Sequence, residues 1–210
     1  MNNKLRNRIA IILVLLFGVS IFYVGTDGFR AFTAESARTL SLEKNKPSFP
    51  SVTLEDSKYQ TYTFQELAKD KYVFITFMYT NCGSVCPILE MNMADVYDLI
   101  PESYLGKDIL FLSISFDTER DTPEVLSKYG SYFEIDEDFW RMARIPNEQE
   151  LQSVLDSLGV IVIPDNNGNF QHNSAFYLIN PNGQLEEVMD FTKIEEAART
   201  TQTFLETGRD

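Results

Sequence analysis

The sequence predicts an α/β fold in which helices cover both faces of one sheet, preceded by a single transmembrane helix. Two stretches of strand length, residues 72–79 and 109–116, are almost continuously apolar, as expected of strands buried on both faces. Stretches with helical spacing of apolar residues alternate with these and the later strands. Residues 9–25 contain no charged side chain, which is typical of a membrane-spanning segment.

The composition limits the class of protein and of ligand. The chain has 210 residues, 44% of them hydrophobic, which is enough for one domain with a full core plus an extension. Its formal net charge is −13. Such an acidic protein repels phosphate groups, so nucleic acid and anionic lipid are not expected as ligands. The negative charge keeps the protein soluble, or it steers a basic or metal-carrying partner.

The N-terminus has the pattern of a membrane anchor. Lys4, Arg6 and Arg8 precede the uncharged residues 9–25, and the first acidic residue, Asp27, follows them. Basic flanks stay in the cytoplasm, so we expect a single-pass protein of the cell membrane with a cytoplasmic N-terminus and an extracytoplasmic domain. A cleaved signal peptide is the alternative, but the apolar run continues past its only suitably spaced small residues.

The expected organisation has four consecutive parts. These are a basic cytoplasmic flank at residues 1–8, a membrane anchor at 9–25, a polar tether at 26–46 and a folded domain at 47–210. Within the domain, β-forming residues alternate or run together in seven expected strands, at residues 51–55, 61–64, 72–79, 109–116, 160–163, 175–179 and 185–191. A turn at residues 180–183 joins the last two strands into a hairpin.

The expected helices have recognisable beginnings. They are placed at residues 64–68, from 87 to about 100, from 123 to about 132, at 148–158, and from 193 to about 205. Thr63, Thr122 and Thr192 are the expected N-caps, and Pro123 suits the first helical position. Trp140 follows an acidic run and is expected to pack beneath a loop without a ligand role.

Cys82 and Cys86, the only two cysteines, lie between the strand at residues 72–79 and the helix that begins near Pro87. A helix N-terminus stabilises a thiolate, and the close spacing lets both sulfurs bind one metal ion or each other. The usual redox motif has two residues between its cysteines. Here there are three, and the wider spacing lets two thiolates hold a metal ion with less strain. Outside the cytosol the pair can also be oxidised, although a structural disulfide here would close only a very small loop.

The order of elements is thioredoxin-like, with the cysteine pair at the first strand-to-helix turn and a hairpin plus helix at the C-terminus. In this arrangement the first hairpin strand lies beside the cysteine-bearing strand, so the loop entering that strand approaches the cysteines. The loop contains His172, the only histidine. Two thiolates and one imidazole favour copper over magnesium or calcium. Structural zinc usually takes four ligands, so zinc is disfavoured.

Four features resemble the Sco/SenC family of copper proteins for cytochrome c oxidase assembly. Residues 76–87, TFMYTNCGSVCP, are similar to its CxxxCP signature. Residues 113–123, SISFDTERDTP, resemble its SxDPxRDTP segment, and residues 177–183, YLINPNG, resemble its YLIxPDG turn. His172 stands where the family has its ligand histidine. The resemblance covers about residues 47 to 206.

The resemblance implies a thioredoxin-like fold, a membrane anchor and copper, as Cu(I) or Cu(II), bound by Cys82, Cys86 and His172. It also implies a task, the maturation of the dinuclear copper centre in cytochrome c oxidase subunit II. A copper donor and a thiol reductant are then further partners. One departure stands beside the site: the family often has Asp before the histidine, and this chain has Gln171. A carboxylate that would orient the imidazole is therefore missing from its usual place.

Two functions are open at this point. The favoured interpretation is a copper-binding metallochaperone rather than an enzyme. The alternative is a thiol-disulfide oxidoreductase that reduces the copper-ligand cysteines of the oxidase, in which Cys82 and Cys86 are the redox-active residues. Redox signalling through a reversible disulfide is a weaker third interpretation.

Overall fold

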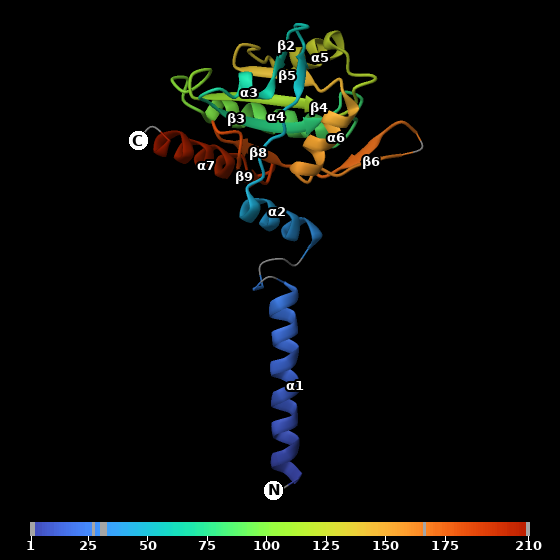
Figure 1. Ribbon diagram of the computed structural model, residues 1–210, viewed down its shortest axis with the longest axis vertical. Coiled ribbons are helices and arrows are strands. Elements are labelled where there is room, and N and C mark those ends of the chain that lie inside the picture. Colours follow the sequence, from blue (N-terminus) through green and yellow to red (C-terminus); the bar gives the residue numbers. More distant parts are fainter. Residues whose placement is uncertain (1–2, 27, 30–32, 166, 209–210) are drawn as a thin grey trace. The chain divides into compact units, whose positions relative to one another are not determined.

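The computed structural model describes residues 3–26, 28–29, 33–165 and 167–208. The chain divides into two compact units, Met1–Asn45 and Lys46–Asp210. The helices of the first unit and the mixed α/β architecture of the second can be followed in Figure 1. The cysteines and the histidine all belong to the second unit.

Helix α1 (Asn3–Gly25) contains the apolar segment predicted at residues 9–25. The span from Lys4 to Gly25 has 22 residues, its most apolar 18-residue stretch has a mean hydropathy of 2.3, and none of that stretch is buried. A helix of this length extends about 33 Å, which matches the hydrocarbon thickness of a bilayer. Among the described residues, α1 is the one helix long and apolar enough to cross a membrane. A signal sequence has the same length and composition, so the helix is compatible with either role.

Helix α2 (Ala34–Asn45) lies within residues 26–46, the segment that the sequence predicts to be a polar tether. The Thr33 hydroxyl accepts a hydrogen bond from the Ser36 amide at 3.0 Å, as an N-cap side chain does. Glu35 and Arg38 form an ion pair one turn apart on the helix. The cap residue and the ion pair are both local features of the sequence. The polar composition of the segment nevertheless did not indicate a helix. Asp27 and residues 30–32 lie outside the described part of the tether.

The second unit is built on a seven-stranded sheet with the strand order β2-β1-β5-β4-β3-β8-β9. The strands are β1 (Thr53–Asp56), β2 (Thr61–Thr63), β3 (Tyr72–Met78), β4 (Ile109–Ser115), β5 (Trp140–Arg144), β8 (Phe176–Ile179) and β9 (Leu185–Met189). Strand β4 runs parallel to both β3 and β5, whereas β8 is antiparallel to β3 and to β9. The predicted pairing of the C-terminal hairpin with the cysteine-bearing strand is confirmed.

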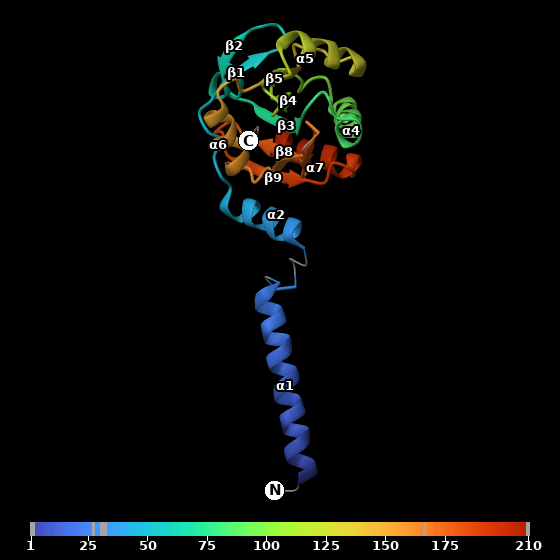
Figure 2. The same cartoon turned by 90° about the vertical axis from the view of Figure 1, so that its right-hand side faces the viewer.

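Helices cover both faces of this sheet. They are α3 (Phe64–Leu67), α4 (Val85–Leu99), α5 (Pro123–Gly130), α6 (Glu148–Ser157) and α7 (Ile194–Thr207), with a short 3-10 turn at Ser131–Phe133. Helices α4 and α7 lie side by side on one face, and α6 lies on the opposite face (Figure 2). Thr63 and Glu66 form the capping box of α3, as predicted from Thr63. The predicted cap of the last helix is wrong, because Lys193 occupies the N-cap position and Thr192 bonds to Asp190.

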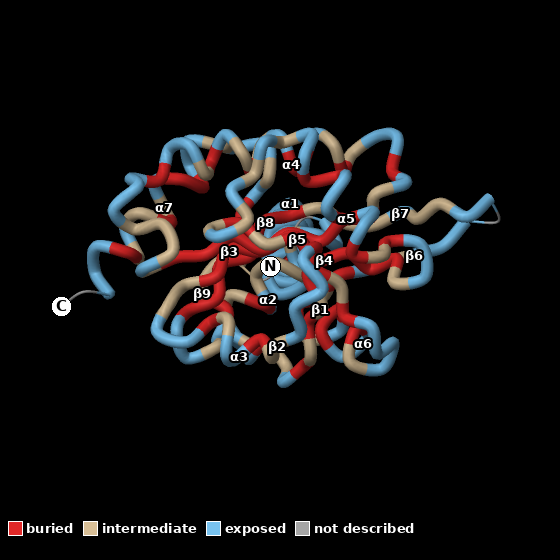
Figure 3. Tube along the Cα trace, turned by 90° about the horizontal axis from the view of Figure 1, so that it is seen from above, coloured by how far each residue is buried: buried red, intermediate tan, exposed pale blue. Residues whose placement is uncertain are grey.

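The main core fills the space between the sheet and the α4 and α7 helices. Its buried apolar side chains are Phe74, Leu89, Met93, Val96, Ile100, Ile109, Phe111, Trp140, Phe176, Leu178, Met189, Ala197, Ala198 and Leu205. Figure 3 shows the buried stretches concentrated in the strands at the centre of the unit. Because the sheet-facing stripe of α4 is packed in this core, the N-terminal turn of α4 that carries Cys86 is held in a fixed place.

Trp140 begins strand β5, which corrects its predicted place beneath a loop. The two arginines in this short strand, Arg141 and Arg144, made its sequence look unlike a buried strand. Acidic side chains of β1 neutralise both arginines. Arg141 lies 3.2 Å from Asp56, and Arg144 lies 2.7 Å from Glu55. The strand is therefore stabilised by cross-strand ion pairs as well as by its apolar side chains.

Strands β6 (Val162–Pro164) and β7 (Phe170–His172) form a separate two-stranded sheet. Val162 pairs with His172, so the histidine ends a strand and does not lie in an irregular loop as the sequence suggested. The Asp165 side chain closes the connection between these strands. Asp165 accepts hydrogen bonds from the amides of Asn167 and Asn169 at 2.8 and 2.7 Å. The hairpin gives the histidine a defined backbone position.

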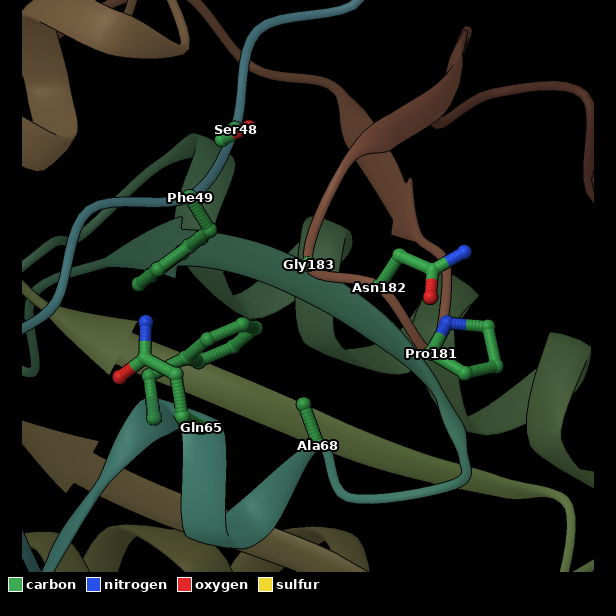
Figure 4. Close-up of a pocket in the computed structure, with 8 residues that line it drawn as sticks. Ser48, Phe49, Gln65, Ala68, Pro181, Asn182 and Gly183 are labelled. Atoms are coloured by element: carbon green, nitrogen blue, oxygen red, sulfur yellow. The ribbon is translucent and has the colours of Figure 1, made fainter.

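A pocket of about 260 Å³ lies at the other end of β3 from the cysteines. It is lined by Ser48, Phe49, Phe64, Gln65, Ala68, Pro181, Asn182 and Gly183. The Phe49 and Phe64 rings stack with their centroids 3.7 Å apart. The turn at residues 181–183 lies across the pocket from Phe49 (Figure 4). The lining contains no cysteine, histidine or carboxylate, so this pocket is separate from the candidate metal site.

Candidate metal site

The segment that leads to Cys82 is held at the end of the sheet by a buried carboxylate. Asp121 is fully buried, and its Oδ2 atom accepts a hydrogen bond from the Thr80 amide at 2.9 Å. The hydroxyls of Thr80 and Ser115 also donate to this carboxylate. Asp121 therefore ties the chain just after β3 to the end of β4, which fixes the approach to the first cysteine.

The helix start of α4 is directed at the Cys82 sulfur. The Cys86 amide donates a hydrogen bond to Cys82 Sγ at 3.3 Å, and the Ser84 hydroxyl lies 3.9 Å from the same sulfur. Both cysteines are free thiols. Cys82 is 7% exposed and Cys86 is not exposed at all. Approach from solvent therefore reaches Cys82 first.

The pKa values of the two thiols are shifted in opposite directions. Burial by itself raises the pKa of Cys82, but hydrogen bonds from the Cys86 thiol and from the Ser84 and Cys86 amides outweigh it, and the net pKa is lowered. Burial, together with the hydrogen bond to Cys82, raises the pKa of Cys86 far above its ordinary value. Cys82 is consequently the sulfur that ionises first, and Cys86 keeps its proton.

His172 meets the buried cysteine. Its Nε2 atom lies 3.4 Å from Cys86 Sγ, and its Nδ1 atom lies 3.1 Å from the main-chain oxygen of Asn173. A carbonyl oxygen only accepts hydrogen bonds, so Nδ1 carries the hydrogen and Nε2 presents a lone pair to the sulfur. Burial lowers the pKa of His172, with the Asn173 contact opposing it, and the ring is neutral at pH 7. A neutral imidazole with a free Nε2 is the form that binds metal.

The Asn173 carbonyl supplies the contact to His172 that is missing because Gln171 replaces the Asp often found in the family. The carboxylate that was missing from its usual place in the sequence would have oriented the imidazole through its second nitrogen. Here the main-chain oxygen of the following residue makes that contact. A backbone acceptor leaves no signature in the amino-acid sequence, so only the folded chain reveals it.

Two aromatic rings contact the histidine ring and a third packs against both of them, and sequence reasoning assigned none of the three to the site. The His172 ring lies 5.1 Å from Phe116 and 6.4 Å from Tyr79, centroid to centroid. Phe170 packs edge-on against both of those rings, and the Arg120 guanidinium lies 5.5 Å above it. The apolar enclosure accounts for the burial of the imidazole. The aromatic character of residues 79 and 116, each directly after a strand, was the available signal.

The donors fit a soft metal ion, although they are not yet arranged around one. In the described part of the chain, no three cysteine, histidine or carboxylate side chains already surround a common point at ligand spacing. Cys86 and His172 are in contact, and Cys82 lies beside the Cys86 amide. Cysteine binds metal as the thiolate, so a metal ion held by these sulfurs would displace their protons. Thiolate and imidazole are the ligand types that copper prefers.

Comparison with known proteins decides the family. The family model described as SCO1/SenC matches residues 45–206. The chain belongs to the SCO1/SenC family. Among its relatives, the SCO1 protein homolog of Bacillus subtilis is 27% identical over 132 residues, which are 62% of this chain and 66% of that protein. The match thus spans about two thirds of the length of that relative.

Solved structures of the SCO1/SenC family have the same fold. The copper-bound ScoI of Bradyrhizobium japonicum superposes with a TM-score of 0.62 at 24% identity, covering 75% of this chain and 99% of that one. BsSco, a member of the Sco family of cytochrome c oxidase assembly proteins, superposes with a TM-score of 0.66 at 21% identity, covering 76% of this chain and 94% of that one. The predicted thioredoxin-like fold is confirmed.

Proposed function

We propose that this chain is a membrane-anchored, extracytoplasmic copper-binding protein of cytochrome c oxidase assembly, with Cys82, Cys86 and His172 as its copper ligands. The contact between Cys86 Sγ and His172 Nε2 at 3.4 Å carries the proposal, because 86 residues separate the two in sequence. Copper in the Bradyrhizobium ScoI structure supports the choice of metal. Membership of the SCO1/SenC family and the likeness to BsSco support the link to oxidase assembly.

The acid-base state of the site suits copper uptake. The Nε2 lone pair is available without loss of a proton, since the Asn173 carbonyl holds the hydrogen on Nδ1. Cys82 is the more easily ionised thiol, whereas Cys86 gives up its proton only when a metal replaces it. A bound copper ion supplies the exchangeable cargo and its redox chemistry. The residues supply two soft thiolates and one imidazole, a set of three that suits Cu(I).

The proposed task is the maturation of the dinuclear copper site in cytochrome c oxidase subunit II. The family relationship motivates this finer assignment. A copper donor must then load the protein, and a thiol reductant must keep both cysteines reduced. The formal net charge of −13 favours partners with a basic docking face.

Copper titration of the His172→Ala variant tests the ligand set. We expect the wild-type protein, reduced and metal-free, to bind one copper ion and to develop a thiolate-to-Cu(II) absorption band. His172→Ala should bind copper at least about 10-fold more weakly and lose or shift that band, because one of three ligands is gone. The matched control is Gln171→Ala, on the same short strand with an exposed side chain. An unchanged band in His172→Ala would overturn the three-ligand proposal.

A thiol-disulfide oxidoreductase is the second candidate function, and the lowered pKa of Cys82 favours it. In that reaction the Cys82 thiolate attacks a disulfide of the partner and forms a mixed disulfide. Cys86 then displaces the partner as a dithiol and closes a Cys82–Cys86 disulfide, which an external thiol reductant reopens. The disulfide switch identified in BsSco supports such a step. Oxidase activity in cells that carry His172→Ala separates the functions, since a reductase tolerates this change and a copper carrier does not.

We further propose that α1 is an uncleaved anchor with its N-terminus in the cytoplasm. A phosphatase that needs disulfides should be active when fused after Asn45, because that position is then outside the cytosol. The intact mass of the protein isolated from cells should equal that of a chain that still contains residues 1–25. Arginine at both Val14 and Phe17, each exposed on α1, should release the chain from the membrane, since each costs about 3 kcal/mol at the bilayer centre. Loss of residues 1–25 from the wild-type protein would instead indicate a cleaved signal peptide.

A further inference from the structure

Arg120, in the loop after β4, lies against the hairpin that carries the histidine. Its guanidinium carbon lies over the face of the Phe170 ring, 5.5 Å from the ring centroid. A Cβ atom added at Gly168, between the two strands of the hairpin, would lie 3.3 Å from Arg120 Nη1. One arginine thus contacts the hairpin both before β7 and at Phe170, the first residue of β7.

The same arginine is anchored to the end of the main sheet. Its Nε atom donates to the carboxylate of Asp117, whose side chain is only 6% exposed. The Asp117 amide donates to the hydroxyl of Ser115, the last residue of β4, at 3.1 Å. The Asp117 carbonyl accepts from the Asp121 amide at 2.9 Å. Because these bonds fix Asp117, the ion pair holds the guanidinium in a defined place.

Phe170 connects this contact to the histidine. Phe170 and His172 are two residues apart on β7, so their side chains lie on the same face of the strand. Both rings pack against Phe116, with centroid distances of 5.5 Å for Phe170 and 5.1 Å for His172. Phe116 and Arg120 both belong to the segment that follows β4. A movement of β7 away from Phe116 therefore also breaks the contact between Arg120 and Phe170.

The hairpin depends on such side-chain contacts for its place. In the described part of the chain, β6 and β7 form a sheet of their own and do not pair with the seven-stranded sheet. The Phe170 amide links the hairpin to the cysteine side by donating to the Tyr79 hydroxyl at 3.3 Å. A segment held in this way opens locally at a lower free-energy cost than a strand inside a sheet. The guanidinium stays charged at any physiological pH, so its contact is permanent.

We propose that Arg120 is a positioning residue that holds the histidine-bearing strand beside the cysteine turn, through its cation–π contact with Phe170 and its ion pair with Asp117. The inference rests on His172 as a proposed copper ligand. Copper held by His172 leaves the site when the imidazole moves away with β7, so the Arg120 contact slows the release of copper. Loss of that contact leaves every ligand atom in the chain, so the release rate changes and the ligand set does not.

Arg120→Met tests the contact in the full, metal-free chain, because it removes the guanidinium and keeps an unbranched side chain. Hydrogen exchange at the Phe170 amide should become about 3-fold faster, as expected for the loss of one partly exposed cation–π contact. The Leu185 amide, which is hydrogen-bonded at the start of β9, should exchange as in the wild type. The matched control is Arg199→Met, which removes an exposed guanidinium bonded to a carbonyl of its own helix α7 and should leave both rates unchanged.

Copper release tests whether the contact acts through the histidine. From the Cu(I)-loaded protein, Arg120→Met should release copper to a chromogenic chelator about 3-fold faster than the wild type, because release and exchange both follow the opening of β7. In a chain that also carries His172→Ala, Arg120→Met should no longer change the release rate. A substitution that only weakened the fold would accelerate release with or without the histidine.

The two measurements divide the outcomes. Faster exchange at Phe170 but not at Leu185, together with faster release that requires His172, supports the proposal. The proposal is wrong if exchange at Phe170 is unchanged, if Leu185 accelerates equally, or if the effect on release is absent or persists in His172→Ala. Failure of the copper ligand set would appear separately, as wild-type copper binding by His172→Ala alone, and the exchange measurement does not depend on metal.

Discussion

Alkylation of the reduced, metal-free protein at pH 7 to 8 is expected to modify Cys82 at least about 100-fold faster than Cys86. Only the thiolate reacts, and each unit of pKa changes its amount about tenfold. The pKa of Cys82 is lowered by the hydrogen bonds that outweigh its burial, whereas burial and the Cys82 contact raise the pKa of Cys86. Exposure acts in the same direction, because Cys86 is completely buried. Mass spectrometry of peptides after timed alkylation gives both rates.

The single variants Cys82→Ser and Cys86→Ser are matched controls for this experiment. Cys86→Ser should retain a reactive Cys82, because the serine hydroxyl can still donate a hydrogen bond and the main-chain amide of residue 86 still donates to the Cys82 sulfur. Cys82→Ser should leave Cys86 almost unreactive. Equal alkylation rates for the two cysteines in the wild type would contradict the assignment of acidity.

This asymmetry bears on both candidate functions. A reductase needs one acidic thiol that attacks and one protected thiol that resolves the mixed disulfide, and the lowered pKa of Cys82 and the raised pKa of Cys86 match these two roles. A copper carrier needs both sulfurs as thiolates, and the proton on Cys86 makes copper affinity depend on pH. His172 adds a donor that the reductase does not use. The contact of His172 with the protected cysteine is therefore what favours copper binding over disulfide exchange.

The sequence predicted those parts of the site that depend on residue type and topology. The apolar run of β3, the cysteine spacing and the hairpin signal at residues 175–191 were enough to bring Cys82, Cys86 and His172 to one end of the sheet. The sequence did not predict the strand that begins at Trp140. Its stability depends on ion pairs with β1, which are tertiary contacts that a local pattern does not contain.

The finer geometry of the site was also beyond the sequence, for two physical reasons. The acceptor that orients His172 is the carbonyl of Asn173, and every residue has a carbonyl. The Tyr79 hydroxyl accepts a hydrogen bond from the Phe170 amide, which is 91 residues away in the chain. The fold determines which main-chain oxygens act as acceptors and where hydroxyls point. The spacing of residue types in the sequence therefore does not predict these contacts.

Glu90 is a further group that no pattern indicated, and it has a large expected effect on stability. It lies one helical turn after Cys86 on α4, and it is fully buried. The Ser113 hydroxyl donates to its Oε2 atom at 2.8 Å, and the Trp140 indole donates to that hydroxyl at 2.9 Å. The Oε1 atom has no hydrogen-bond partner among the described residues. Burial raises the pKa of Glu90 to about 8 although the Ser113 bond opposes it, so the carboxyl is protonated at pH 7.

The buried carboxyl makes the stability of the fold depend on pH. Between the ordinary pKa of 4.5 and the folded value of about 8, the folded chain holds a proton that the unfolded chain releases. The free energy of unfolding therefore falls as pH rises through this range, by up to about 1.4 kcal/mol per pH unit from this group. Below pH 4.5 both states are protonated, and the penalty disappears.

Glu90→Gln is expected to stabilise the protein by about 3 kcal/mol at pH 7 and to change it little at pH 4.5. The amide cannot ionise, and its oxygen still accepts the hydrogen bond from Ser113. Urea unfolding of the detergent-solubilised chain at several pH values measures the difference. Glu102→Gln, at an exposed position just after α4, replaces the same type of carboxyl without the burial and should show no such pH-dependent gain. A parallel shift of both variants at every pH would mean that charge alone, and not burial of the Glu90 carboxyl, sets the stability.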